Sequence, residues 1–147
     1  MEYMNFFIFV GNFILIALAW AMTYTGLPGE PAAILGTLMG IDFIAGVSAA
    51  RKSGLVVSSQ RMRVGIISKF GVLTIPLVMA LTAKGLGADL NWLVNWSISL
   101  FILSESYSII ANIYAYKTGK VVPEFDAVAA VLKRVRGLLD NFDKREN

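Results

Sequence analysis

Long uncharged stretches separated by short polar turns dominate the hydrophobic pattern of this chain. The first stretch runs from Tyr3 to Gly29, and its 27 residues include no charged side chain. At 1.5 Å per residue they would form about 40 Å of helix, more than the roughly 30 Å of a hydrocarbon core. The pattern therefore predicts a first membrane span at about residues 3–25. Ala19-Trp20-Ala21 has the form of a signal-peptide cleavage site, but the residues before the apolar run include no Lys or Arg, which favours a retained span.

Three further apolar segments predict three more spans, and turn-forming or capping residues bound them. Pro31 suits a first helical position, Gly87 suits a helix end, and Asp89 can cap the last span. The predicted fold is an all-α integral membrane protein, with a transmembrane domain at 1–116 and a tail at 117–147. The three further spans are expected at about residues 31–50, 64–83 and 90–116.

Positive charge is concentrated in one connection of the predicted fold. Residues 51–69 contain five basic side chains and no acidic one. Cytoplasmic loops carry an excess of Lys and Arg, so this segment is expected on the cytoplasmic side, and four spans then place both termini there as well. The expected cytoplasmic basic loop comprises Arg51, Lys52, Arg61 and Arg63.

Composition supports a membrane protein and excludes most enzyme classes. Hydrophobic residues make up 56% of the chain and charged residues 16%, whereas soluble domains have roughly 25% charged residues. The chain has no Cys and no His, which removes thiolate nucleophiles, the commonest general base and the usual zinc ligands. We therefore expect no catalytic residue, cofactor or metal, and a location in a membrane. The net charge of +3 is better explained by a membrane face than by nucleic acid.

Small residues and one carboxylate share faces of the second predicted span. Asp42 and Gly46 lie at i and i+4, and so occupy one side of the helix. Gly36 and Gly40 form a GxxxG step on an adjacent face, a spacing that permits close helix contacts in membranes. With Ala50, these glycines are the residues expected to allow close helix packing, either inside the bundle or between subunits.

The fourth predicted span carries a second polar stripe. Glu105, Ser108 and Asn112 lie at i, i+3 and i+7. Ionisable residues in a span should face protein or water rather than lipid. The two stripes could pack against each other in one bundle, face other subunits or a water-filled lesion, or carry protons in a small transporter. Lys69 could neutralise either Asp42 or Glu105, or could extend to the cytoplasmic surface.

The tail after the last span has the pattern of an amphipathic helix. Its apolar residues alternate steps of three and four, whereas Lys133, Arg134 and Arg136 lie off that seam. Fewer than three heptads is short for a coiled coil, so the helix could equally lie on the inner leaflet or pair subunits. Either location makes it a cytoplasmic appendage. The seam comprises Phe125, Val128, Leu132, Val135, Leu139 and Phe142.

Three of these segments, in this order, resemble the bacteriophage holin family of the toxin-secretion and phage-lysis type. The first is Asp42 to Ala50, the second leads from Ser58-Ser59 to Lys69, and the third runs from Glu105 through Asn112 to Pro123. The resemblance covers roughly residues 36–125. The chain departs from the family at Ser104, where Asn is more frequent, and at Ala111, where a second acid is common.

The resemblance implies a small protein that accumulates in the cytoplasmic membrane of a bacterial host, oligomerises and forms a lesion. A muralytic enzyme (an endolysin) or a toxin would escape through that lesion without direct binding to the protein. The expected partners are therefore the lipid bilayer and further copies of this chain. The alternative is a small four-helix proton-coupled transporter that uses a membrane-embedded carboxylate.

Overall fold

The computed structural model describes residues 12, 16–17, 19–123 and 125–146, and every regular element within them is a helix. Four long helices follow a short helical stretch at residues 19–25. Most of the first predicted span, at 3–25, lies outside the described residues. The long helices are α2 (Gly29–Lys52), α3 (Ser59–Leu86), α4 (Asn91–Thr118) and α5 (Ala127–Glu146).

Local chemistry explains where the helices begin and end. α4 ends at Gly119, whose φ of 72° is left-handed and whose N–H donates to the Ala115 carbonyl at 2.8 Å. The N-cap residue of α4 is Leu90 and not the predicted Asp89, although a side-chain oxygen of Asp89 accepts the N–H of Asn91 at 3.3 Å. α2 and α3 extend a few residues beyond both ends of their predicted spans, and α4 extends beyond the C-terminal end of its span, because flanking residues continue the helical turns.

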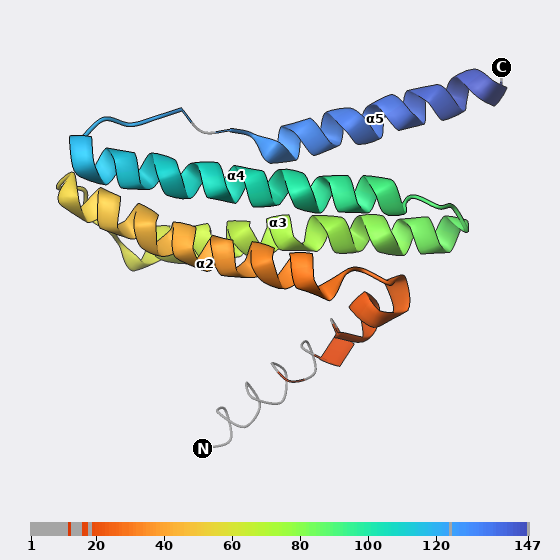
Figure 1. Cartoon of the computed structure of the whole chain (residues 1–147), viewed down its shortest axis with the longest axis horizontal. Coiled ribbons are helices and arrows are strands. Elements are labelled where there is room, and N and C mark those ends of the chain that lie inside the picture. The colour runs from red at the N-terminus through yellow and green to blue at the C-terminus, as the bar shows by residue number, and fades with distance from the viewer. Residues whose placement is uncertain (1–11, 13–15, 18, 124, 147) are drawn as a thin grey trace.

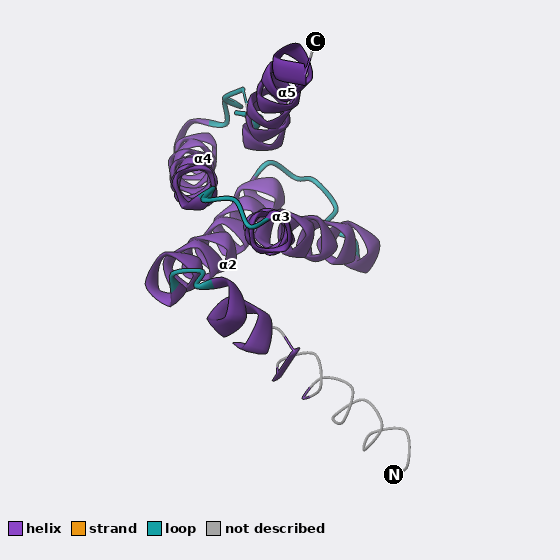
Figure 2. Ribbon diagram, turned by 90° about the vertical axis from the view of Figure 1, so that its right-hand side faces the viewer, coloured by secondary structure: helices purple, strands orange, loops and turns teal. Residues whose placement is uncertain are grey.

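The three helices α2, α3 and α4 lie lengthwise beside one another (Figure 1). α2 has its most extensive contact with α4, whereas α3 touches both more sparsely. An end-on view shows α5 on the outside of this bundle, next to α4 (Figure 2). Three segments are long and apolar enough to cross a membrane: Gly29–Lys52, Met62–Leu86 and Asn91–Thr118. The second, third and fourth predicted spans are thereby confirmed as membrane-span candidates, while the four-span topology and the sides of the termini stay predictions.

The distribution of side chains is that of a protein surrounded by lipid. Large apolar side chains point outward, including Ile44 (67% exposed) on α2, Ile67 (63%) on α3 and Leu103 (66%) on α4. Two polar residues, Asp42 and Ser97, are instead 7% and 0% exposed. Lipid tails accept an apolar exterior, whereas polar groups in a span must find partners inside the protein. Helices α2, α3 and α4 therefore form a multi-pass membrane bundle.

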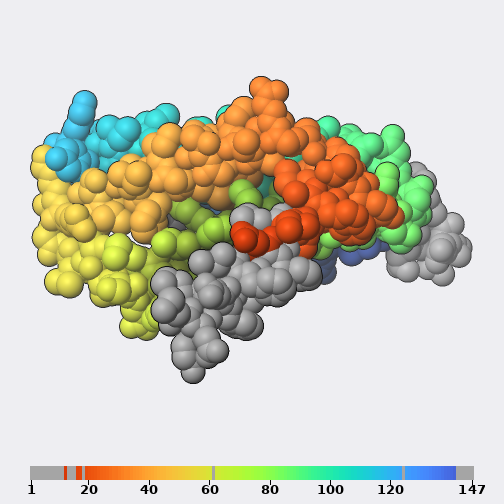
Figure 3. Space-filling model, turned by 90° about the horizontal axis from the view of Figure 1, so that it is seen from below, coloured from red at the N-terminus to blue at the C-terminus, as the bar shows by residue number. Residues whose placement is uncertain are grey.

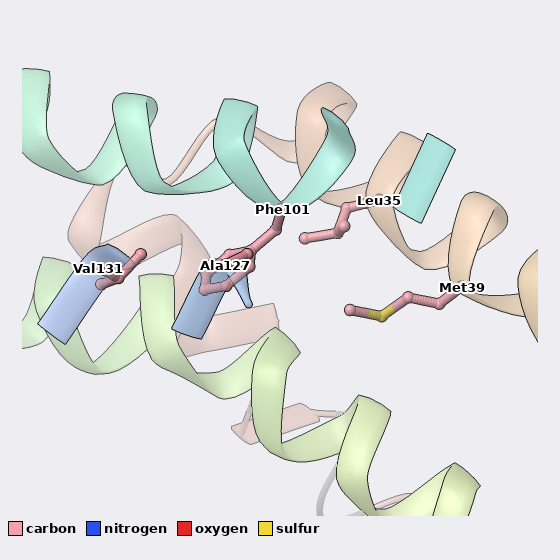
Figure 4. Close-up of a cluster of buried hydrophobic side chains, with 5 residues drawn as sticks. All are labelled: Leu35, Met39, Phe101, Ala127 and Val131. Carbon is pink, nitrogen blue, oxygen red and sulfur yellow. The ribbon is translucent and has the colours of Figure 1, made fainter. Parts of the chain in front are cut away.

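The apolar core joins the middle of the bundle to the start of α5. Phe101 of α4 lies between Leu35 of α2 and Ala127 of α5 (Figure 4). Met39 and Val131 complete this cluster, and all five side chains are buried.

The apolar seam predicted for the tail is split between two environments. Val128 and Val135 pack against the core cluster, but Leu132 and Leu139 are 64% and 62% exposed. Phe125 is also 50% exposed, so the seam side chains that the structure describes are divided between the interior and the outer surface.

Candidate functional site

Four polar side chains from three helices meet inside the bundle. The Nζ atom of Lys69 on α3 lies 2.8 Å from Oδ2 of Asp42 on α2 and 2.6 Å from Oε2 of Glu105 on α4. The Asn112 amide, also on α4, donates to the other Asp42 oxygen at 2.9 Å. We refer to Asp42, Lys69, Glu105 and Asn112 as the ion cluster. Lys69 bridges the two carboxylates, so the cluster combines two negative charges with one positive charge.

The ion cluster lies deep in the transmembrane layer. Asp42 is close to the midpoint of α2, and Glu105 is at the midpoint of α4. The side chains of Asp42, Glu105 and Lys69 are 10%, 13% and 23% exposed, respectively. An isolated charge at this depth costs about 3 kcal/mol on insertion scales. Mutual pairing and the Asn112 amide offset that cost within a single chain.

Helical periodicity brings these residues together. Glu105, Ser108 and Asn112 share one side of α4, and Asp42 and Gly46 share the side of α2 that faces it. A Cβ atom on Gly46 would lie 3.4 Å from the Asn112 amide nitrogen, so the missing side chain leaves room for that amide. Ser108 does not join the ion cluster but lines the cavity beside it.

This cavity has a volume of about 350 Å³ and extends from the ion cluster to the α4–α5 linker. Two α4 side chains hold the linker in place. The Tyr107 hydroxyl donates to the Pro123 carbonyl at 2.9 Å, and the Ser104 hydroxyl donates to the Phe125 carbonyl at 3.4 Å. The stripe predicted from the sequence omits both donors, although Ser104 and Tyr107 lie at i and i+3 on the side of α4 adjoining Ser108.

The GxxxG step occupies a different part of α2. Cβ atoms on Gly36 and Gly40 would meet nothing within 4 Å among the described residues. Both glycines line an apolar groove of about 280 Å³ between α2 and α3, together with Phe43 and Phe70. Figure 3 shows the side of the molecule on which α2 (orange) lies along α3 (yellow to green). Ala50 lines a separate cavity nearer the end of α2.

The predicted basic loop lies at one end of the bundle. Arg51 and Lys52 form the last turn of α2, and Arg61 and Arg63 belong to the first turns of α3. The Lys52 ammonium lies 4.3 Å above the centroid of the Tyr116 ring. Within the part of the chain that the structure describes, no group of three or more His, Cys, Asp or Glu side chains could hold a metal ion.

These features define the class of protein, which is a multi-pass helical membrane bundle with a paired ion cluster at mid-depth. The model of the bacteriophage holin family matches residues 19–134, which is most of the chain. The chain belongs to this family, whose members are non-enzymatic pore-forming proteins of the cytoplasmic membrane. Searches of curated proteins and of solved structures found no match.

Proposed function

We propose that this chain accumulates in the bacterial cytoplasmic membrane, associates with further copies and forms a lesion that releases an endolysin or a toxin. The observation that carries the proposal is the paired ion cluster at mid-membrane depth in a chain of the holin family. A holin must be stable in lipid while it accumulates and must face water when it opens. Carboxylates paired inside one subunit favour the first state, and their charge favours water in the second.

In this mechanism Asp42 and Glu105 hold the closed arrangement through Lys69 and then turn toward the opening. Ser108 and Asn112 extend the same polar face along α4. The basic segment 51–69 marks the cytoplasmic side. Collapse of the membrane potential is the trigger we propose, because moving one charge across 100 mV changes the free energy by about 2.3 kcal/mol.

Contacts between copies are assigned to the apolar groove between α2 and α3. Gly36 and Gly40 leave that groove open, and small residues let helix backbones of two subunits approach closely. Gly46 and Ala50 contribute close contacts nearer the ion cluster. The groove is apolar, so it can face lipid before assembly and another helix afterwards.

The test is induced expression in bacteria that also produce a cytoplasmic muralytic enzyme. A potential-sensitive dye reports the membrane potential, and culture turbidity reports release of the enzyme. We expect an abrupt, nearly simultaneous loss of potential and turbidity after a delay. Cells that stay energised and intact while the full-length chain accumulates in their membranes would contradict the proposal.

A second candidate function is proton-coupled transport of a small solute. It is favoured by the unequal charge of the ion cluster, in which two carboxylates share one ammonium beside a polar cavity. Such a transporter would change solute resistance or uptake at harmless expression levels. It would leave the muralytic enzyme inside the cell, so the same experiment separates the two functions.

A further inference from the structure

The α4–α5 linker, described at residues 119–123 and 125–126, turns back along α4 instead of leading away from it (Figure 1). The 28 residues of α4 extend over about 42 Å, compared with a hydrocarbon core of roughly 30 Å. Ser104, at the midpoint of α4, is inside the core for any placement of α4 that spans it. Because the Ser104 hydroxyl contacts the Phe125 carbonyl, the linker reaches the middle of the transmembrane layer.

Non-helical backbone at this depth has a specific physical requirement. In lipid every unpaired N–H and C=O group costs several kcal/mol, so irregular segments occur only where protein buries them or where they line a water-filled cavity. Among the described residues, the N–H groups of Val121 and Val122 have no protein acceptor. Side-chain hydroxyls bind two linker carbonyls, those of Pro123 and Phe125. The remaining groups need water.

The cavity beside the linker offers space and partners for that water. Its volume of about 350 Å³ is far above the roughly 10–15 Å³ that a single water requires. Linker side chains line one side, and the ion cluster with Ser104 and Ser108 lines the other. Polar groups at several points of the wall can each bind water. The cavity therefore connects the linker to the ion cluster through a polar environment.

α5 continues in the same direction after the linker. Ala127 and Val131 pack against Phe101 and Leu35 at mid-depth (Figure 4). One turn later the Arg134 guanidinium lies 5.5 Å from the centroid of Trp92, at the N-terminal end of α4. That end of α4 is opposite the end that carries the basic segment 51–69. α5 thus leads away from the basic segment and not back toward it.

We propose that the α4–α5 linker is a re-entrant segment lining an aqueous cavity that admits water and small ions to the ion cluster, and that α5 leaves the membrane opposite the basic segment. The inference rests on the proposed function in one respect: in the open assembly, the side of the subunit that contains the cavity faces the aqueous opening. It places the tail differently from the cytoplasmic appendage that the sequence pattern predicts.

Thiol accessibility tests the cavity, because the natural chain has no Cys and every introduced thiol is unique. Ser104→Cys and Leu103→Cys are a matched pair at the same depth. Ser104 lines the cavity, whereas Leu103 is 66% exposed on the outer surface of the bundle. The full-length variants are treated in membrane vesicles with a membrane-impermeant thiol reagent. We expect Ser104→Cys to react at least tenfold faster than Leu103→Cys. Equal rates would overturn the aqueous cavity.

A second pair of thiols tests the exit of α5. Ser53→Cys marks the side of the basic segment, and Asn141→Cys lies in the exposed part of α5. Each variant is labelled in right-side-out and in inverted vesicles. We expect the two thiols to react from opposite faces of the membrane. Reaction from the same face would overturn the re-entrant path and place the tail beside the basic segment.

Both labelling experiments are carried out below the expression level that permeabilises the cells. Their outcome is therefore independent of lesion formation. If labelling follows the expected pattern but induced cells stay energised, the proposed function fails and the re-entrant linker stands. If induced cells lyse but the labelling pattern is the opposite, the linker assignment fails and the proposed function stands.

Discussion

The two contacts of α2 use small residues in opposite ways. Against α4, Gly46 faces the Asn112 amide at 3.4 Å, and neighbouring Asp42 is bound by Asn112 and Lys69. Against α3, Gly36 and Gly40 border an open apolar groove. The same helix therefore has one contact that is filled within the chain and one that is not.

The difference between the two contacts matches two requirements of a protein that first accumulates in lipid and later assembles with other copies. The α2–α4 contact pairs the charges inside one subunit, which makes a single chain compatible with lipid. The α2–α3 groove has a mainly apolar lining, so it can lie in lipid and still accept a helix from another copy. Under the proposed function, the ion cluster governs the closed state and the groove governs association.

Removal of the bridging cation should have the largest effect on the α2–α4 contact. Lys69→Met leaves Asp42 and Glu105 as unpaired carboxylates, and breaking a buried pair in this way typically costs about 3–5 kcal/mol. We expect a lower unfolding temperature in detergent, followed by circular dichroism, and a shifted time of potential loss in cells. Lys84→Met, near the exposed end of the same helix, is the control. Equal unfolding temperatures for the two variants would show that Lys69 does not stabilise the bundle.

Neutralising one carboxylate at a time should have a smaller effect. Asp42→Asn and Glu105→Gln each leave Lys69 with one negative partner. Hydrogen bonds to charged groups contribute about 1.5–3 kcal/mol, and Asp42 has two such partners, so its substitution should be the more costly. We expect both variants to insert normally and to alter lysis timing, with Asp42→Asn the larger change. Unchanged timing in both would remove these carboxylates from the mechanism.

Larger side chains at Gly46 and at Gly40 should have different effects, the first on the stability of the single chain and the second on association between copies. Gly46→Leu displaces the Asn112 amide, and overpacking typically costs about 1–3 kcal/mol. A Cβ atom on Gly40 meets no described atom within 4 Å, so Gly40→Leu can extend from there into the apolar groove and should leave the unfolding temperature nearly unchanged. We expect Gly40→Leu to reduce chemical cross-linking between copies in membranes. If cross-linking is unchanged, copies do not meet at the groove.

Periodicity predicted much of this arrangement because it depends on local geometry. Spacings of three, four and seven placed Glu105 and Asn112 on one face, and charge patterning marked the segment around Arg51. These signals lie within single helices. Of the four spans predicted from the sequence, three are therefore found as span candidates, and the polar stripes could be proposed without any knowledge of the neighbouring helices.

The pairing of polar side chains between different helices could not be predicted from the sequence and was found in the structure. The sequence left open whether Lys69 would pair with Asp42, with Glu105 or with solvent, because that choice depends on how three helices approach in space. The return of the linker depends on hydroxyl groups of Ser104 and Tyr107 that bind backbone carbonyls. Every residue offers the same backbone carbonyl, so such bonds leave no residue pattern to recognise.

The smallest expected effect concerns the linker that covers the polar cavity. Tyr107→Phe removes only the hydroxyl that donates to the Pro123 carbonyl, a change typically worth about 0.5–1.5 kcal/mol. Tyr114→Phe is the control, since the Tyr114 hydroxyl has no hydrogen-bond partner among the described residues. In the Ser104→Cys background, we expect Tyr107→Phe to raise the rate of thiol labelling by roughly two- to tenfold, as that energy range implies.

In this background the Ser104 hydroxyl is replaced by a thiol, and burial of Ala127 and Val131 still holds the linker, so the loss of the Tyr107 hydroxyl should loosen it without releasing α5. The unfolding temperature should change little, and Asn141→Cys should still react from the face opposite Ser53→Cys. A labelling rate equal to that of Tyr114→Phe would mean that the hydroxyl does not restrain the linker. The barrier between the cavity and bulk water would then lie in the packing of α5 on Phe101.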